Sequence, residues 1–273
     1  MSATENPLGR KVAFPESYMP SVLYVIPRWA SRSLLDIDKK HALFGFDCWR
    51  AYELSWLNPG GKPVACMAEI YFDARSEFIV ESKSMKLYLH SLNRKRFDSS
   101  EEAGRLIAQD LTAASNSEVE VVLHEPASPS FALREPAGEC LDSLDIEVTA
   151  AAPDETLLLT QSIDVTDETL YSHLFRSNCP ITGQPDWGSF FIRYSGAQID
   201  HAGLLHYLCS FRSHHGYHEE CAERMYRDIL RRCEPDELIV GLNFLRRGGL
   251  DINPFRSNRQ ISPWDLVSRY IRQ

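Results

Sequence analysis

Apolar segments follow one another in the same order in both halves of the chain, and this order limits the folds that the chain can adopt. Asn58-Pro59-Gly60-Gly61 separates two apolar runs and is a strong turn signal, so the first half opens with a β-hairpin. Residues 82–92 carry four apolar side chains and few β-branched residues, which indicates a helix, and we expect Ser82 to cap it. The elements predicted for the first half are strands over 48–57 and 63–72, helices over 82–92 and 99–114, and strands over 119–123 and 144–148.

The second half repeats this order of elements more than it repeats the sequence. Asp200 precedes a helical pattern there and is a favourable N-cap residue. The elements predicted for the second half are strands over 170–175 and 188–194, helices over 200–211 and 219–233, and strands over 238–245 and 250–253. This order predicts an α+β fold with antiparallel sheets. Because residues 150–155 read as a linker, we predict two domains, 1–150 and 151–273.

Composition and charge exclude several classes of function. With 273 residues, of which 44% are hydrophobic and 25% charged, the chain is able to bury sizeable cores. The formal net charge of −9 disfavours nucleic-acid binding, which requires a basic face. No apolar run approaches the roughly 20 residues of a spanning helix, and the N-terminus lacks the apolar core of a secretion signal. We therefore expect a cytoplasmic protein without a membrane or nucleic-acid partner. Residues 1–40 contain several prolines, and we expect them to form an extended arm.

One cysteine stands in a loop that favours reactivity. The chain has seven cysteines and no Cys-x-x-Cys pair, so we expect reduced thiols. Cys179 lies in the segment 177–188, where two prolines and Gly183 restrict the backbone. A thiolate there is a nucleophile, and Asp186 is placed to exchange protons with whatever the sulfur attacks. On this loop alone, a half-buried cysteine in an ordinary hairpin loop explains the residues equally well.

Two longer motifs decide between these interpretations. They are Cys-Pro-Ile-Thr-Gly-Gln-Pro-Asp-Trp-Gly at 179–188 and Glu-Ser-Lys-Ser-Met-Lys-Leu-Tyr at 81–88, and shorter matches occur at Asn6-Pro7-Leu8-Gly9, 52–57, 218–219 and 246–254. Together they resemble the NADPH-dependent 7-cyano-7-deazaguanine reductases, nitrile reductases of queuosine biosynthesis for tRNA modification. The resemblance covers nearly the whole chain and is to the long form of the family. It implies two tandem tunnelling-fold (T-fold) domains, each with the order ββααββ, and a homodimer.

The resemblance also implies a role for particular residues. Cys179 is expected to add to the nitrile carbon and form a covalent thioimide, and Asp186 to donate the proton that the nitrogen needs. NADPH is expected to deliver hydride twice, which yields an aminomethyl group, and no metal is implied. Substrate binding is implied for Val80, Glu81, Ser82, His218 and Glu219, and cofactor binding for Ser82, Lys83, Arg247 and Gly248.

These roles suit the chemistry of the residues. A carboxylate accepts the two N–H donors on one edge of a deazaguanine at once, which fits Glu81 and Glu219. The guanidinium of Arg247 matches a phosphate group, and Gly248 permits close approach of the backbone.

A zinc site is the competing interpretation. Five potential ligands lie within thirteen residues: Cys209, His214, His215, His218 and Cys221. On a single helix, His214, His218 and Cys221 would share one face, as in a zinc-dependent cyclohydrolase of the same superfamily. Gly216, however, is expected to interrupt such a helix.

A third interpretation is a non-catalytic purine-binding protein on the same fold. It would keep Glu81 and Glu219 but would not need both Cys179 and Asp186.

Overall fold

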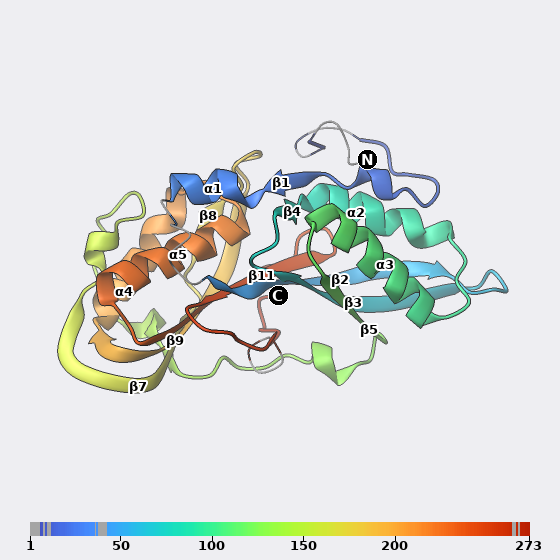
Figure 1. Cartoon of the computed structure of the whole chain (residues 1–273). Coiled ribbons are helices and arrows are strands. Elements are labelled where there is room, and N and C mark those ends of the chain that lie inside the picture. Colours follow the sequence, from blue (N-terminus) through green and yellow to red (C-terminus); the bar gives the residue numbers. More distant parts are fainter. Residues whose placement is uncertain are drawn as a thin grey trace. The chain divides into compact units, whose positions relative to one another are not determined.

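The computed structural model describes residues 6–7, 9, 12–35, 37, 43–263, 266 and 268–273. Its helices are α1 (Arg28–Leu34), α2 (Ser82–Ser91), α3 (Ser100–Ser115), α4 (His201–Cys209) and α5 (His218–Cys233). Its strands are β1 (Val25–Pro27), β2 (Phe44–Leu57), β3 (Pro63–Asp73), β4 (Phe78–Val80), β5 (Val119–His124), β6 (Glu139–Cys140), β7 (Thr160–Ser172), β8 (Arg176–Asn178), β9 (Pro185–Ile199), β10 (Glu237–Phe244) and β11 (Leu250–Ser257) (Figure 1). Helices and mainly antiparallel strands confirm the predicted α+β class.

Contacts divide the chain into two compact units that interleave along the sequence. Unit 1 comprises 1–31, 47–132 and 246–252, and unit 2 comprises 32–46, 133–245 and 253–273. The domains predicted from the sequence are contiguous, whereas these units exchange segments near both ends of the chain. The boundary at residue 150 stays a prediction.

The sheet of unit 1 has the order β5, β3, β2 and the beginning of β11. The predicted hairpin is confirmed as β2 and β3. Its turn is closed by Asn58, whose side-chain oxygen accepts a hydrogen bond from the Lys62 amide at 2.9 Å. Gly61 has φ 86°, a value that favours glycine. The turn residues therefore form the hairpin for the reason that the sequence suggested.

Helices α2 and α3 lie over one face of this sheet and enclose the core of unit 1 (Figure 1). Large buried side chains of that core include Trp49, Trp56 and Tyr88. Helix α3 has Ser99 as its N-cap residue and begins at Ser100, within one residue of the start predicted from the sequence. The predicted cap of α2 is wrong, because Ser82 is already helical and Glu81 occupies the N-cap position.

In unit 2 the sheet has the order β11, β10, β9, β7, β6, and β8 pairs with β9. The strand predicted over 188–194 is the middle of the longer β9, and the one predicted over 170–175 overlaps only the end of β7. Asp200 caps α4 as predicted, since its carboxylate accepts a hydrogen bond from the Gly203 amide at 2.7 Å. Helices α4 and α5 pack with these strands in a second core, which contains Phe190, Tyr207 and Met225 among other residues.

The strand predicted over 144–148 is wrong. The segment is not helical, and its exposure alternates between half-buried and exposed from Leu144 to Glu147. Leu144 and Ile146 pack against the core of unit 2. Among the described residues, however, no strand pairs with this segment, so the alternation predicted its burial but not its hydrogen bonding.

The predicted arm over 1–40 is correct only in part. Residues 28–34 form helix α1 and residues 25–27 form strand β1, which pairs with β4. Within unit 1, Tyr18 donates to the Asp110 carboxylate at 2.9 Å. Residues 1–5, 8, 10–11, 36 and 38–40 lie outside the described residues, and Leu8 of the motif Asn6-Pro7-Leu8-Gly9 is one of them.

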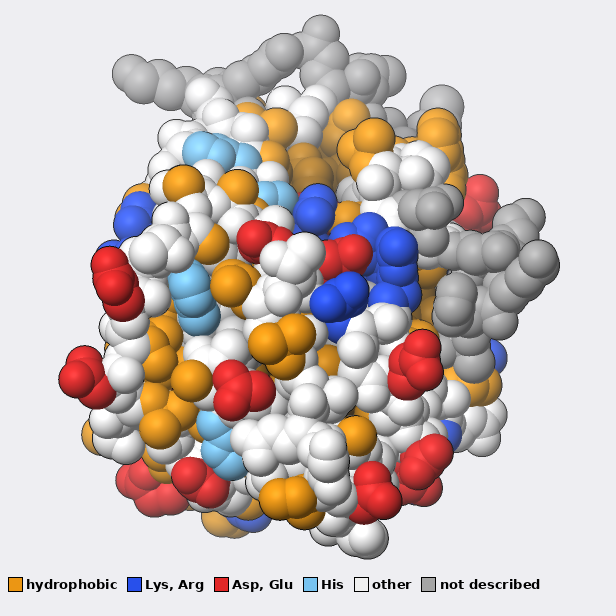
Figure 2. All heavy atoms as spheres, turned by 90° about the vertical axis from the view of Figure 1, so that its left-hand side faces the viewer, with side chains coloured by type: hydrophobic (Ala, Val, Ile, Leu, Met, Phe, Trp, Pro, Cys, Tyr) orange, Lys and Arg blue, Asp and Glu red, His pale blue; other side chains and the backbone are white. Residues whose placement is uncertain are grey.

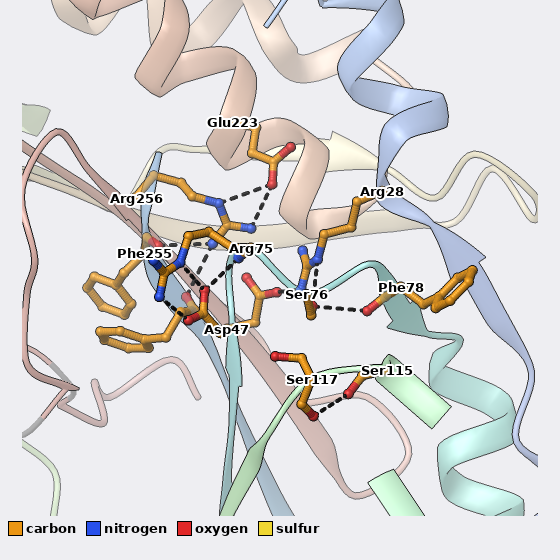
Figure 3. Close-up of polar contacts among 12 residues, drawn as sticks. Arg28, Asp47, Arg75, Ser76, Phe78, Ser115, Ser117, Glu223, Phe255 and Arg256 are labelled. Atoms are coloured by element: carbon orange, nitrogen blue, oxygen red, sulfur yellow. Dashed lines mark hydrogen bonds and ion pairs between the residues drawn. The ribbon is translucent and has the colours of Figure 1, made fainter. Parts of the chain in front are cut away.

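Buried ion pairs connect distant segments within each unit (Figure 3). In unit 2, Arg256 is fully buried and donates two hydrogen bonds to the Glu223 carboxylate at 3.1 and 3.0 Å. Arg32 donates to the same carboxylate at 2.7 Å. In unit 1, the Arg28 guanidinium contacts Asp47 at 2.5 Å. Each of these guanidiniums therefore has a carboxylate partner, which buried ions require.

Charge is unevenly distributed on the surface. Figure 2 shows acidic side chains spread across one face, whereas several lysine and arginine side chains gather in one group on it. This distribution fits the net charge of −9 and the absence of a broad basic face on that side. No helix in the described part of the chain is long and apolar enough to cross a membrane.

Candidate active site

The β8–β9 hairpin places Cys179 and Asp186 close to each other. Strand β8 pairs antiparallel with the beginning of β9, and Ser177 lies opposite Asp186. The pairing continues one step beyond β8, because the Cys179 amide donates to the Gln184 carbonyl at 2.9 Å. Cys179 and Asp186 are thus diagonal neighbours on the same face of the hairpin, for which a separation of about 7–8 Å is typical.

The loop between these two residues is held by its own backbone. The Gly183 amide donates to the Cys179 carbonyl at 3.0 Å. Gly183 has φ 67°, and a Cβ built there would meet nothing within 4 Å. Both Cys179 and Asp186 are buried, with 8% and 4% exposure. A short loop whose own residues 181–185 are exposed therefore presents a buried thiol and a buried carboxyl group together.

His218, the first residue of α5, lies next to Asp186. Its Nε2 atom is 3.5 Å from the Asp186 carboxylate. The imidazole stacks on Phe244, with ring centroids 3.8 Å apart, so its orientation is fixed. The sequence predicted a substrate contact for His218 but not its contact with Asp186, since nothing in the sequence relates residues 32 positions apart.

Asn178 ties this hairpin to the segment before α5. Its amide donates to the His214 carbonyl at 2.8 Å, and its carbonyl accepts from the Gly216 amide at 3.1 Å. These two hydrogen bonds hold residues 214–216, which lead into α5 and His218, against the hairpin. Asn178 was not singled out in the sequence, although its place directly before Cys179 was the available signal.

Glu219 follows His218 in the first turn of α5. Glu219 is only 6% exposed. An acidic group is favoured at this end of a helix, because the helix dipole places partial positive charge there. The structure therefore gathers four predicted site residues in unit 2: Cys179, Asp186, His218 and Glu219.

The other predicted residues belong to unit 1, where Glu81 is the best defined. Its carboxylate accepts hydrogen bonds from the amides of Lys83 at 2.7 Å and Ser84 at 2.8 Å. The residue is 2% exposed, and Val80 before it is also buried. Because an ionised carboxylate has about four acceptor sites, capping α2 leaves capacity for further donors.

Arg247 and Gly248 lie in a tight turn of unit 1. The Arg247 and Leu250 backbones bond to each other in both directions, and Gly248 and Gly249 have φ 56° and 77°. Positive φ at both central residues is the pattern of a type I′ turn. A Cβ on Gly248 would lie 3.0 Å from the Lys86 ammonium, so Lys86 joins Arg247 beside this turn. The donor set and the small Gly248 fit a phosphate-bearing cofactor.

The arrangement proposed for a zinc site is not formed. Helix α5 begins at His218 and contains Cys221, but His214 lies before it, so His214 shares no helical face with the other two residues. The described residues instead bring ligand atoms of His214, Glu220 and Cys221 within 4.8 Å of one another. His214 lies 3.3 Å from the Glu220 carboxylate, and burial raises the pKa of Cys221 well above its usual value. This group is explained by polar contacts and a buried thiol.

Comparisons with known proteins identify the family. Residues 14–123 match the family "Nitrile reductase, 7-cyano-7-deazaguanine-reductase N-term", and residues 185–263 match the family "QueF-like protein". The chain is 47% identical over 257 residues to the NADPH-dependent 7-cyano-7-deazaguanine reductase of Coxiella burnetii (strain RSA 493 / Nine Mile phase I), covering 93% of this chain and 91% of that one.

Two further relatives carry the same name. The protein of Azoarcus sp. (strain BH72) is 47% identical over 260 residues, which cover 94% of this chain and 92% of the relative. The protein of Burkholderia multivorans (strain ATCC 17616 / 249) is 46% identical over 260 residues, with 94% and 95% coverage. Identity at this level over nearly the full length of both proteins shows that the chain belongs to the 7-cyano-7-deazaguanine reductase family of nitrile reductases.

Proposed function

We propose that this chain reduces the nitrile of 7-cyano-7-deazaguanine to an aminomethyl group, with NADPH as reductant and a covalent intermediate on Cys179. The observation that carries this proposal is the β8–β9 hairpin, in which a buried thiol and a buried carboxyl group lie on one face. Family membership and the shared name of the relatives support the same reaction.

The first step is addition of the Cys179 sulfur to the nitrile carbon. The C–S bond forms as one π bond of the nitrile breaks, and the nitrogen takes up a proton. Asp186 accepts the thiol proton and passes it to that nitrogen, so the step needs no outside acid. His218, 3.5 Å from the carboxylate, orients Asp186 during the transfer.

The resulting thioimide accepts hydride more readily than a nitrile. NADPH, when bound, supplies hydride to this carbon, and two hydrides with two protons complete the reduction to the amine. The C–S bond breaks in the course of this reduction and returns Cys179 as a thiol. Because Cys179, which carries the thioimide, and Asp186 are only 8% and 4% exposed, water competes poorly for this intermediate.

Binding of the substrate rests on the carboxylates of Glu81 and Glu219. Each is buried, and each accepts N–H groups of the deazaguanine in a shielded environment. Val80, Ser82 and His218 complete the proposed contacts with the substrate. The cofactor is bound by Ser82, Lys83, Arg247 and Gly248, where basic side chains and a glycine turn receive phosphate.

The functional form is proposed to be a homodimer in the cytoplasm. The resemblance to T-fold proteins, which close their sheets by assembly, supports the dimer, and exposed sheet edges favour such pairing. Analytical ultracentrifugation tests it, because a single species at the mass of one chain would contradict the dimer.

The decisive experiment follows NADPH absorbance after addition of 7-cyano-7-deazaguanine and identifies the product by mass spectrometry. We expect about two NADPH consumed per aminomethyl product, as a four-electron reduction demands. Cys179→Ala should abolish turnover and the covalent adduct. Asp186→Asn should lower kcat by about 10²–10⁴. Cys140→Ala, which changes a half-buried cysteine of the same unit, serves as the control with unchanged rate. Full turnover by Cys179→Ala would refute the mechanism.

A further inference from the structure

Trp187 lies on the face of the β8–β9 hairpin opposite to Asp186, since neighbouring residues of a strand point to opposite faces. Three arginines surround its ring. The guanidinium carbons of Arg176, Arg212 and Arg272 lie 5.4, 5.5 and 5.7 Å from the ring centroid. Since all three guanidinium carbons lie within 5.7 Å of the same centroid, the separation of any two of them is at most twice that distance. All four residues belong to unit 2.

The three arginines come from separate segments. Arg176 is in β8 directly opposite Trp187, Arg212 is in the 3₁₀ turn after α4, and Arg272 is near the end of the chain. Convergence of three cations on one ring is thus a product of the fold. A cluster of three cations is also unexpected in a chain of net charge −9, because carboxylates that could pair with them are plentiful.

The polar contacts of these guanidiniums go to neutral acceptors. Arg176 donates to the Asn178 side-chain oxygen at 3.1 Å, and Arg272 donates to the His173 carbonyl. Among the residues that the structure describes, no carboxylate forms an ion pair with any of the three. The buried Nε atom of Arg176 likewise lacks a hydrogen-bond acceptor within this described part.

A bound anion explains two features of this cluster: the crowding of three positive charges around one ring, and the lack of carboxylate partners among the described residues. Three like charges held close together repel one another, and the Trp187 ring offsets only part of that cost through cation–π attraction. Guanidinium forks match phosphate oxygens in pairs, which is why arginine is common where phosphate is bound. Arg212 is exposed, and Arg176 and Arg272 are half-buried, so an anion can reach them from solvent.

We propose that Arg176, Arg212 and Arg272, arranged around Trp187, form a binding site for a phosphate group on the face of the β8–β9 hairpin opposite to Cys179 and Asp186. Two sources supply this chemistry: a free phosphate or pyrophosphate, and the 2′-phosphate of NADPH. An occupant bridging β8, the turn after α4 and the final segment would brace the hairpin that carries the nucleophile.

Isothermal titration of the full chain with inorganic pyrophosphate tests the site and needs no catalytic turnover, so the result is independent of the proposed reaction. Arg212→Gln and Arg272→Gln should each raise the Kd at least about tenfold, as expected for loss of a charged hydrogen bond. Arg259→Gln is the matched control, since it removes the same charge from unit 2. Arg259 pairs with Glu237, which lies opposite Ser195, eight residues along β9 from Trp187 and about 26 Å away.

Unchanged pyrophosphate binding in both variants, or no binding to the wild type at millimolar concentration, overturns the proposal. Circular dichroism of each variant identifies a loss of folding, and the exposed Arg212 makes Arg212→Gln the safer of the two. Competition then identifies the source. If NADP⁺ but not NAD⁺ displaces pyrophosphate, the 2′-phosphate of the cofactor occupies the site. If pyrophosphate binds equally well at saturating NADP⁺, the ligand is a free phosphate.

Discussion

Glu81 has two roles, capping of α2 and the proposed binding of the substrate, and together they give the sharpest prediction about function. Its carboxylate caps α2 through the amides of Lys83 and Ser84, and we propose that its remaining acceptor sites bind the substrate. Glu81→Ala removes both the helix cap and the proposed substrate contact. Loss of a cap costs about 1 kcal/mol per hydrogen bond, so two bonds amount to about 2 kcal/mol. For a chain of this size the Tm should fall by about 4–8 °C.

The effect on catalysis should be far larger than this loss of stability. Two charge-assisted hydrogen bonds to the deazaguanine, at about 1.5–3 kcal/mol each, predict a decrease of kcat/KM by about 10²–10⁴. The assay is steady-state NADPH oxidation well below the Tm of the variant, over a range of substrate concentrations. Most of the decrease should appear in KM, since the lost contacts hold the substrate before any bond changes.

Ser99→Ala provides the matched control. Ser99 caps α3, a helix of the same unit, through a hydrogen bond to the Glu102 amide at 3.2 Å. Its removal should lower the Tm by about 2–4 °C and leave kcat/KM unchanged. If Glu81→Ala retains the kcat/KM of Ser99→Ala, Glu81 is only a helix cap and our reasoning about substrate binding is refuted.

Three further predictions concern pH and stability. Burial raises the pKa of Cys233 to about 11, so its alkylation by iodoacetamide, followed by peptide mass spectrometry, should accelerate as pH rises toward 11; a flat rate from about pH 8 upward would contradict this. Glu223→Gln leaves the buried Arg256 charge uncompensated and should lower the free energy of unfolding in urea by about 3–5 kcal/mol, whereas Glu237→Gln, which breaks a solvent-accessible pair with Arg259, should cost less than about 1 kcal/mol. Gly183→Ala should cost about 1–2 kcal/mol through its positive φ alone, and Gly183→Asn less; equal stability of all three proteins would disprove strain in this loop.

Local sequence signals predicted most elements of the fold. The turn at Asn58 and the cap Asp200 act over a few residues, and each is found where it was expected. Two local predictions failed for local reasons. Ser82 and Glu81 are both able to cap a helix, and the choice between them depends on where the backbone turns. The segment 144–148 has the alternation of a strand but no partner in the described structure.

The site was predictable in its residues but not in its contacts. Cys179 and Asp186 occur in one motif, so their proximity across a hairpin follows from a short loop. The contact of His218 with Asp186 depends on α5 and on backbone bonds from Asn178 to the segment before that helix. Such contacts join distant parts of the sequence, and no periodicity reports them. The residues around Trp187 were missed for the same reason, because their three arginines are scattered over nearly a hundred positions.

The interleaving of the two units has a consequence for the nascent chain on the ribosome. In unit 1 the Tyr52 hydroxyl donates to the Asp251 carboxylate at 2.6 Å, across 199 residues of sequence. At typical rates of translation, β2 emerges about 10–40 s before this partner is synthesised. During that interval one edge of β2 has no neighbouring strand, and such an edge is a site for aggregation. Completion of unit 1 is therefore delayed until residues 246–252 have been synthesised, which makes chaperone protection more important for this chain than for one whose domains are contiguous.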